Sequence, residues 1–216
     1  MNFKKYYILF IIIFTINSFV KSQNREFIVG SMIGFYGIHI EGDTKEMYSL
    51  SNGMFEGTGG LSLGLNVKRS FSENIYGAFE LRYIRKGSIY EFNTNYGTQA
   101  FEIIKLNYIE LPVLFGLKIN LKKKYVLFES GLAYARLMNS KMFVSDLNKW
   151  DSSWEINNFK ENDISWVANL KYPIIKSEKL LLGLRYSYSL LSTHSVYKLY
   201  SMNYGIELYY LLNRNI

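Results

Sequence analysis

The chain has 216 residues, enough for one domain, and 17% of them are aromatic, with 19 Tyr and 15 Phe. It contains no cysteine, which excludes disulfide bonds, thiolate metal sites, thiol catalysis and a lipidated N-terminal cysteine. Part of the formal net charge of +7 lies in the first 22 residues and the remainder is scattered along the chain, so nucleic acid binding is not predicted.

Residues 1–22 predict a cleavable signal peptide. Lys4 and Lys5 form a basic start, and the apolar run that follows ends at Val20, which makes it short for a membrane span. Val20 and Ser22 lie three and one residues before a cut ahead of residue 23, where signal peptidase prefers small side chains. We therefore expect export, with residues 23–216 as a single mature domain. An uncleaved membrane anchor is the less favoured alternative.

After this leader the sequence alternates between apolar and polar residues with a period of two, which is typical of β-strands, and no segment carries a sustained helical stripe. In the clearest segment, Leu63 and Leu65 would lie on one face while Ser62 and Asn66 lie on the other. Eight such segments are expected, at 27–38, 61–68, 75–86, 108–118, 126–135, 164–172, 180–189 and 202–210.

The connections between these segments alternate between long and short. Short turns are expected at 70–74, 120–124 and 176–179, and long loops at 39–57, 87–104, 137–163 and 191–201. If the chain begins in the periplasm, all the short turns fall on the periplasmic side, as in outer-membrane barrels. The predicted fold is therefore all-β: an eight-stranded antiparallel up-and-down transmembrane β-barrel with short periplasmic turns and long extracellular loops.

The polar faces indicate which side of the barrel wall points inward. Among their Gly, Ser and Ala residues stand six charged residues of both signs, which suit a narrow interior filled by ion pairs: Glu80, Arg82, Glu110, Glu129, Arg185 and Glu207. The apolar faces carry aromatic residues near both ends, as expected for two girdles at the surfaces of a bilayer. A soluble barrel of the lipocalin type is the alternative, and the signal peptide and the girdles favour the membrane.

Three segments resemble a known family. The run Tyr108–Lys118 reads YIELPVLFGLK, Glu80–Gly87 reads ELRYIRKG, and Gly183–Leu190 reads GLRYSYSL. Together they resemble the PorT-like, or porin-family, outer-membrane β-barrel domain of Bacteroidota, although Ser189 stands where that family often has Gly. The resemblance implies an outer-membrane barrel without a defined biochemical activity. The name-giving member is associated with type IX secretion and gliding, a role that barrel motifs alone do not transfer.

Candidate functional residues are few. An eight-stranded lumen is just wide enough to be filled by its own side chains, so the six charges are expected to form a salt-bridged plug rather than an ion path. Trp150, Trp154 and Phe159 in the expected loop 137–163 are the best candidates for partner contact, because aromatic residues on surface loops often bind. His39 and His194 have no catalytic motif around them, so no enzyme activity, metal site or cofactor is predicted.

Two functions from different classes follow. The first is a structural or interaction role in the cell envelope, with the lipid bilayer of the outer membrane as the surroundings and envelope or secretion-system proteins as candidate partners. The alternative is transport, as a narrow porin-like channel or as a component of a secretion (type IX-like) machinery. Reproducible ion currents across a bilayer would favour the second function, and their absence the first.

Overall fold

The computed structural model describes residues 27–43, 54–93, 99–122, 124–146, 149–155 and 158–212. Within these ranges the chain forms strands and turns, and none of it is a helix of the length and hydrophobicity that a transmembrane helix requires. The strands are β1 (Phe27–Gly42), β2 (Met54–Glu56), β3 (Thr58–Ser70), β4 (Ile75–Asn93), β5 (Gln99–Asn120), β6 (Tyr125–Asp146), β7 (Lys149–Glu155), β8 (Asn162–Pro173), β9 (Leu180–Ser189) and β10 (Leu199–Leu211).

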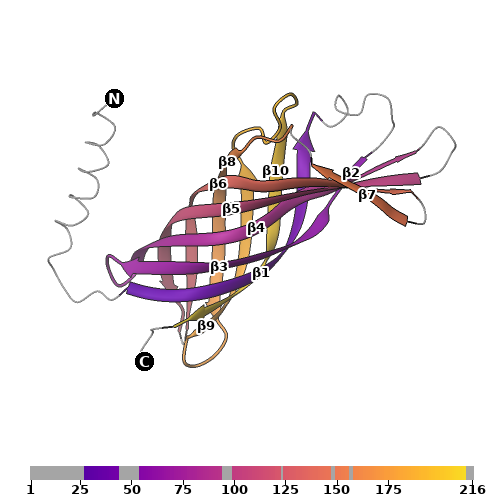
Figure 1. Cartoon of the computed structure of the whole chain (residues 1–216). Coiled ribbons are helices and arrows are strands. Elements are labelled where there is room, and N and C mark those ends of the chain that lie inside the picture. Colours follow the sequence, from indigo (N-terminus) through magenta and orange to yellow (C-terminus); the bar gives the residue numbers. More distant parts are fainter. Residues whose placement is uncertain are drawn as a thin grey trace, which may run out of the picture.

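Eight of these strands close into a barrel (Figure 1). Each barrel strand pairs antiparallel with the next, in the order β1, β3, β4, β5, β6, β8, β9 and β10. The first and last strands then pair from Gly30 opposite Leu211 to Gly42 opposite Leu199, so the barrel has no open edge. The predicted eight-stranded antiparallel barrel is confirmed.

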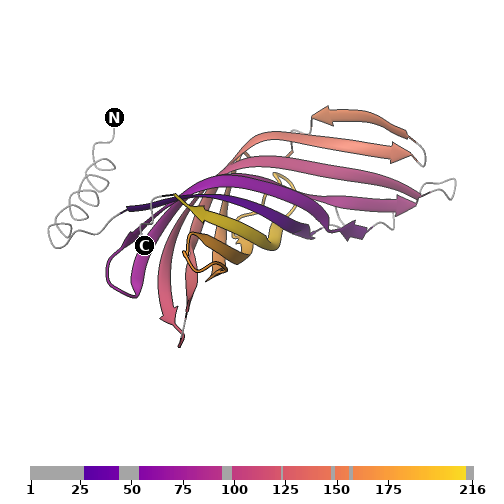
Figure 2. The same ribbon diagram turned by 90° about the horizontal axis from the view of Figure 1, so that it is seen from below.

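The loops expected at 87–104 and 137–163 are wrong over most of their length, because strands fill them. The hairpin of β4 and β5 continues to Asn93 opposite Gln99, and β6 continues to Asp146 before the chain returns as β7. β5 and β6 have 22 residues each, about twice the 9–11 that cross a bilayer, whereas β9 has 10. The surplus length projects beyond the barrel as a sheet flanked by β2 and β7, which we call the overhang (Figures 1 and 2).

Two irregularities mark the place where the overhang begins. Gly87 has φ of +150°, and a Cβ atom there would lie 2.0 Å from the carbonyl oxygen of Ile104, so the position requires glycine. On β6 the register against β5 shifts at Met138, which is an extra residue between the partners of Tyr108 and Asn107, as at a β-bulge. An extra residue moves the rest of β6 to the opposite face, so the period of two does not continue through the bulge.

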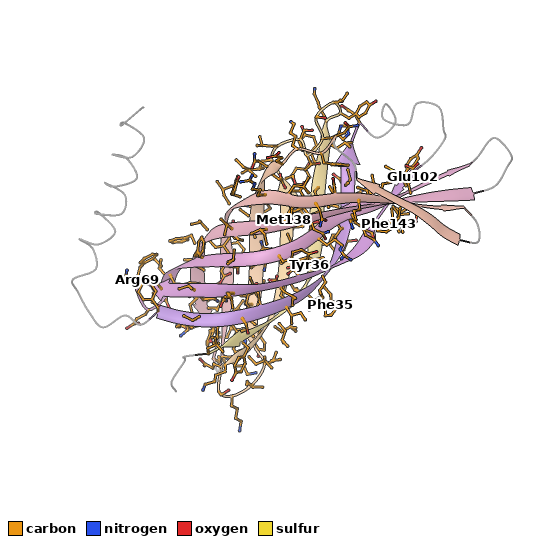
Figure 3. The ribbon with its side chains drawn as sticks, viewed as in Figure 1. Phe35, Tyr36, Arg69, Glu102, Met138 and Phe143 are labelled. Atoms are coloured by element: carbon orange, nitrogen blue, oxygen red, sulfur yellow. The ribbon has the colours of Figure 1, made fainter. Side chains whose placement is uncertain are left out.

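The two faces of the wall differ as the alternation predicts. On β1, Phe35 points outward and is 67% exposed, whereas the next residue, Tyr36, is 4% exposed and points into the barrel (Figure 3). The outward rows expose large apolar side chains around the whole circumference, among them Leu65, Leu81, Val113, Leu132, Leu170, Leu184 and Ile206. We call the end with the short turns 71–74, 121–124 and 174–179 the turn end; the overhang lies at the other end.

Candidate functional site

The inner face of the wall holds ten buried charged side chains among the described residues, five cationic and five anionic. They come from seven of the eight barrel strands: Lys68, Arg82, Lys86, Lys171, Arg185, Glu80, Glu110, Glu129, Asp163 and Glu207. Equal numbers make the interior neutral overall. Burial of so many charges is tolerable only if each lies next to an opposite charge.

The structure places all six interior charges expected from the sequence in this set, and it adds four more. Lys68, Lys86 and Lys171 stand on polar faces in the sequence, but a lysine there could equally have pointed to water at a strand end. Asp163 falls at the boundary of an expected loop. It points into the barrel because β8 begins one residue earlier, at Asn162. The alternation along β3, β4 and β8 was the signal that could have found the lysines.

Arg185 on β9 lies at the centre of the barrel and contacts two glutamates across the lumen. Its Nη1 lies 3.0 Å from Glu80 Oε2, and its Nη2 lies 2.7 Å from Glu110 Oε1. Arg82 Nη2 lies 3.4 Å from Glu80 Oε2 and 2.5 Å from Glu207 Oε1. Each guanidinium therefore bridges two carboxylates and gives each of them a nearby positive charge.

Toward the turn end, Glu129 is the next junction. Its carboxylate lies 2.5 Å from Lys171 Nζ and 3.0 Å from Lys68 Nζ, and it accepts a hydrogen bond of 2.9 Å from the Tyr76 hydroxyl. Lys171 Nζ also reaches Glu80 Oε1 at 3.3 Å. Lys171 therefore links Glu129 to the central group.

Toward the overhang, Lys86 has the corresponding role. Its Nζ lies 2.7 Å from Asp163 Oδ2 and 3.7 Å from Glu110 Oε2. The Asp163 carboxylate also accepts hydrogen bonds from the hydroxyls of Ser165, at 3.1 Å, and Ser189, at 2.8 Å. Lys86 is thus held between the central group and the start of β8.

These contacts form one continuous series, in which the sign of the charge alternates at every step. We call it the interior charge chain; it runs Lys68, Glu129, Lys171, Glu80, Arg185, Glu110, Lys86 and Asp163. Arg82 and Glu207 branch from Glu80, and the hydroxyls of Tyr36 and Tyr209 donate to Glu207. The arrangement fills the lumen with fixed side-chain pairs.

The family whose description reads "Outer membrane protein beta-barrel domain" matches residues 17–195. The chain belongs to this family. Similar solved structures include Ail, the attachment invasion locus protein of Yersinia pestis, with a TM-score of 0.48, 13% identity and coverage of 87% of this chain and 99% of Ail. Neisserial surface protein A (NspA) has a TM-score of 0.48 and 12% identity, covering 88% of this chain and 100% of NspA.

OprG from Pseudomonas aeruginosa has a TM-score of 0.48 and 10% identity, covering 87% of this chain and 96% of OprG. None of the curated proteins matches the chain. The family assignment makes the protein a small outer-membrane β-barrel.

In this outer-membrane barrel, apolar layers pack next to the interior charge chain toward both ends. Along β4 the inward positions read Tyr76, Ala78, Glu80, Arg82, Ile84 and Lys86, so apolar residues lie on the turn side of Glu80 and again between Arg82 and Lys86. The layer at the turn end also includes Met32, Leu114, Tyr125, Leu127, Val167, Leu181, Tyr209 and Leu211; the other includes Tyr36, Ile38, Ile40, Ile104, Leu106, Tyr108 and Leu199. An ion that crossed the barrel would have to pass both layers.

At the end that carries the overhang, two chain segments lie together over the barrel. Phe159 and His194 form an isolated antiparallel bridge, and the Phe159 ring meets the His194 ring edge-on, with 5.2 Å between their centres. His194 is buried, and its Nδ1 accepts hydrogen bonds from the backbone N–H groups of Val196, at 3.2 Å, and Tyr197, at 3.1 Å. Burial, and then the charge of Lys160, lower the pKa of His194 below its usual value.

The expectation that Phe159 is an exposed loop aromatic is wrong, because its side chain is only 6% exposed and fills the space beside His194. Trp150 and Trp154 belong to β7, a strand rather than a loop, and their side chains lie outside the described part of the structure. His39 lies on the outward row of β1, whereas His194 is buried in the segment before β10. Over the described residues, no group of three or more potential ligands is placed to hold a metal ion.

Proposed function

We propose that this outer-membrane barrel is a non-conducting, non-catalytic protein of the cell envelope that anchors the overhang at the cell surface for contact with a partner. The observation that carries the proposal is the interior charge chain. It occupies the lumen with paired charges, and apolar layers pack next to it toward both ends. A barrel of this kind serves as a membrane anchor.

Transport has less support, because conduction needs a continuous polar path. An ion entering the lumen would compete for residues such as Arg185 and Glu110, which lie 2.7 Å apart and are almost fully buried. Leaving one buried charge without its partner costs about 3 to 5 kcal/mol, and the series contains several pairs in succession. The alternative of a narrow porin-like channel would therefore require the charge chain to rearrange.

The overhang provides the surface for a partner. Met138, near the point where β6 leaves the barrel wall, is 62% exposed (Figure 3). Farther along β6, Lys105 Nζ lies 4.2 Å from the centre of the Phe143 ring. Apolar and basic groups are thus presented together on strands rather than on free loops. We propose that Trp150 and Trp154, on β7 of this same sheet, contact an envelope or secretion-system partner.

We further propose that the chain is exported by a signal peptide at 1–22, which lies outside the described residues, and that the turn end faces the periplasm. The short connections at the turn end support this orientation, because outer-membrane barrels have short periplasmic turns. The Leu-Pro segment of β5 supports a place in the PorT-like branch of Bacteroidota barrels. Pro112 in that segment is buried on the inner face opposite Ala133.

Two measurements test the function. In planar bilayers the full-length protein should give no reproducible unitary currents, and currents from the wild-type barrel would contradict the anchor role. In cells, a photo-crosslinking residue at Met138 or Lys105 should give a discrete adduct. A crosslinker at Leu65, on the lipid-facing wall, is the matched control. Adducts of the same mass from both places, or from neither, would argue against a partner at the overhang.

A further inference from the structure

The turn end carries a recurring combination of exposed apolar and basic side chains. All three turns expose a large apolar residue at the rim of the barrel: Phe71, Leu121, and the pair Ile174 and Ile175. Each apolar residue has basic residues within a few positions in the sequence. We call these the basic rim: Arg69, Lys122, Lys124, Lys176 and Lys179.

The apolar residues of the turns continue the lipid-facing wall. The Phe71 ring lies against Gly77, an outward position of β4, so closely that a Cβ atom there would lie 3.0 Å from it. The wall and Phe71 thus form one apolar surface that reaches past the ends of the strands. In water, a phenylalanine folded onto the outside of a barrel would extend an exposed apolar surface, so this contact favours a lipid environment.

Two members of the basic rim lie directly over aromatic rings of that wall. The Arg69 guanidinium carbon is 4.9 Å from the centre of the Phe27 ring, and Lys124 Nζ is 4.7 Å from the centre of the Tyr172 ring. Phe27 and Tyr172 belong to outward rows and are exposed. Aromatic residues at the end of a lipid-facing row mark the depth at which acyl chains meet headgroups, so these two cations lie where lipid phosphates lie.

The charge at the turn end is also one-sided. In sequence, the three turns and the adjacent Arg69 contain two acidic residues, Glu73 and Glu178, against the five cations of the basic rim and Lys123. At the opposite end of the barrel, both signs occur side by side, as in the pair of Arg136 with Glu161 at 4.0 Å. A basic surface with inserted apolar side chains at a membrane boundary is complementary to anionic lipid.

We infer that the basic rim binds the anionic headgroups of phospholipids in the leaflet that surrounds the turn end. The inference deepens the proposed function, on which its assignment to the periplasmic leaflet rests. The cations would fix the depth and tilt of the barrel, and Phe71, Leu121 and the two isoleucines would insert beside them. An acidic periplasmic protein is the competing occupant, and it would not require the cations to lie over lipid-facing rings.

Spin-labelled lipids test the inference with the full-length protein in vesicles of phosphatidylcholine. Electron paramagnetic resonance measures the fraction of labelled lipid that the barrel immobilises. Labelled phosphatidylglycerol should be preferred over labelled phosphatidylcholine by about fivefold, equivalent to about 1 kcal/mol, and the preference should fall as salt is raised. The variant R69Q/K122Q/K124Q/K176Q/K179Q should bind both lipids equally.

A matched variant at the other end, K105Q/R136Q/K141Q/K160Q/K198Q, removes the same number of charges and should keep the preference. Equal affinity of the wild-type protein for the two lipids, or equal loss of preference in both variants, would overturn the inference. Both variants should still show heat-dependent migration on gels, which establishes that they fold. Unitary currents would refute the anchor role and leave this lipid measurement intact, so the two failures are distinguishable.

Discussion

Substitution of Arg185 by methionine should lower the free energy of unfolding of this barrel far more than the loss of an exposed arginine would. Arg185 is 2% exposed, and it makes two charge-assisted contacts, at 3.0 Å with Glu80 and at 2.7 Å with Glu110. Its removal leaves the interior with one uncompensated negative charge. Because removing one partner of a buried pair leaves the other charge desolvated, we expect a loss of about 3 to 5 kcal/mol in the free energy of unfolding.

A second change should restore part of this stability. In the double variant R185M/E110Q the interior is neutral again, and Lys86, the remaining partner of residue 110, keeps Asp163 at 2.7 Å. We therefore expect the double variant to be more stable than R185M alone by about 1 to 3 kcal/mol. Reversible unfolding in urea, with the protein in phospholipid vesicles and tryptophan fluorescence as the signal, measures both values.

The matched control is R136M. Arg136 is also an arginine paired with a glutamate, but its side chain is 67% exposed and lies 4.0 Å from Glu161, so its loss should cost at most about 1 kcal/mol. If R185M cost no more than R136M, or if E110Q added its own penalty on top of R185M, the interior charges would not form the coupled series described above.

Three further predictions concern the wall, the overhang and the segment over the barrel. Leu65→Arg, on the lipid-facing row, should lower the free energy of unfolding in vesicles by about 2 to 4 kcal/mol. Ser62→Ala should change this free energy little, because the buried Ser62 hydroxyl has no hydrogen-bond partner in the described structure. Gly87→Ala should place a Cβ atom against the Ile104 carbonyl oxygen and weaken the overhang by about 1 to 3 kcal/mol, which hydrogen exchange of β4 and β5 amides would report. The lowered pKa of His194 means that the folded segment favours the neutral imidazole ring. The neutral ring therefore stabilises the fold of this segment fully above a pH of about 6.5, and this stabilisation is lost as the pH falls through the lowered pKa. The two amides that donate to its Nδ1 should then lose protection from hydrogen exchange, and unchanged protection factors at low pH would contradict that account.

The alternation in the sequence predicts the wall of the barrel well, because each strand there crosses the bilayer once and faces lipid on one side only. Leu184 and Arg185 illustrate this: neighbouring residues on β9 have opposite surroundings, and the period of two alone assigns them. The pairing of Arg185 with Glu110 could not be predicted in the same way. These residues lie on strands that are not neighbours in the sheet, and only closure of the barrel brings them together.

The overhang and Phe159 were missed for other physical reasons. β6 continues through a register shift at Met138, which interrupts its alternation, while β4 and β5 stay paired past Gly87, a position of positive φ. Phe159 lies in a segment with too few apolar residues to predict burial, and it is buried because a second segment, around His194, pairs with it. Long-range pairing of this kind leaves no local pattern in either segment.

The most direct test of the closed, packed lumen uses the absence of cysteine from the chain. Single-cysteine variants can be made at Ser187, fully buried on the inner face of β9, and at Leu184, exposed on its outer face. In vesicles, Ser187→Cys should resist a water-soluble maleimide while the barrel is folded, and a fluorophore on Leu184→Cys should be quenched by spin-labelled acyl chains. Rapid labelling of Ser187→Cys in the folded protein, with the fluorophore on Leu184→Cys unquenched, would contradict the account. It would show that water enters the lumen and that the outer wall does not contact lipid.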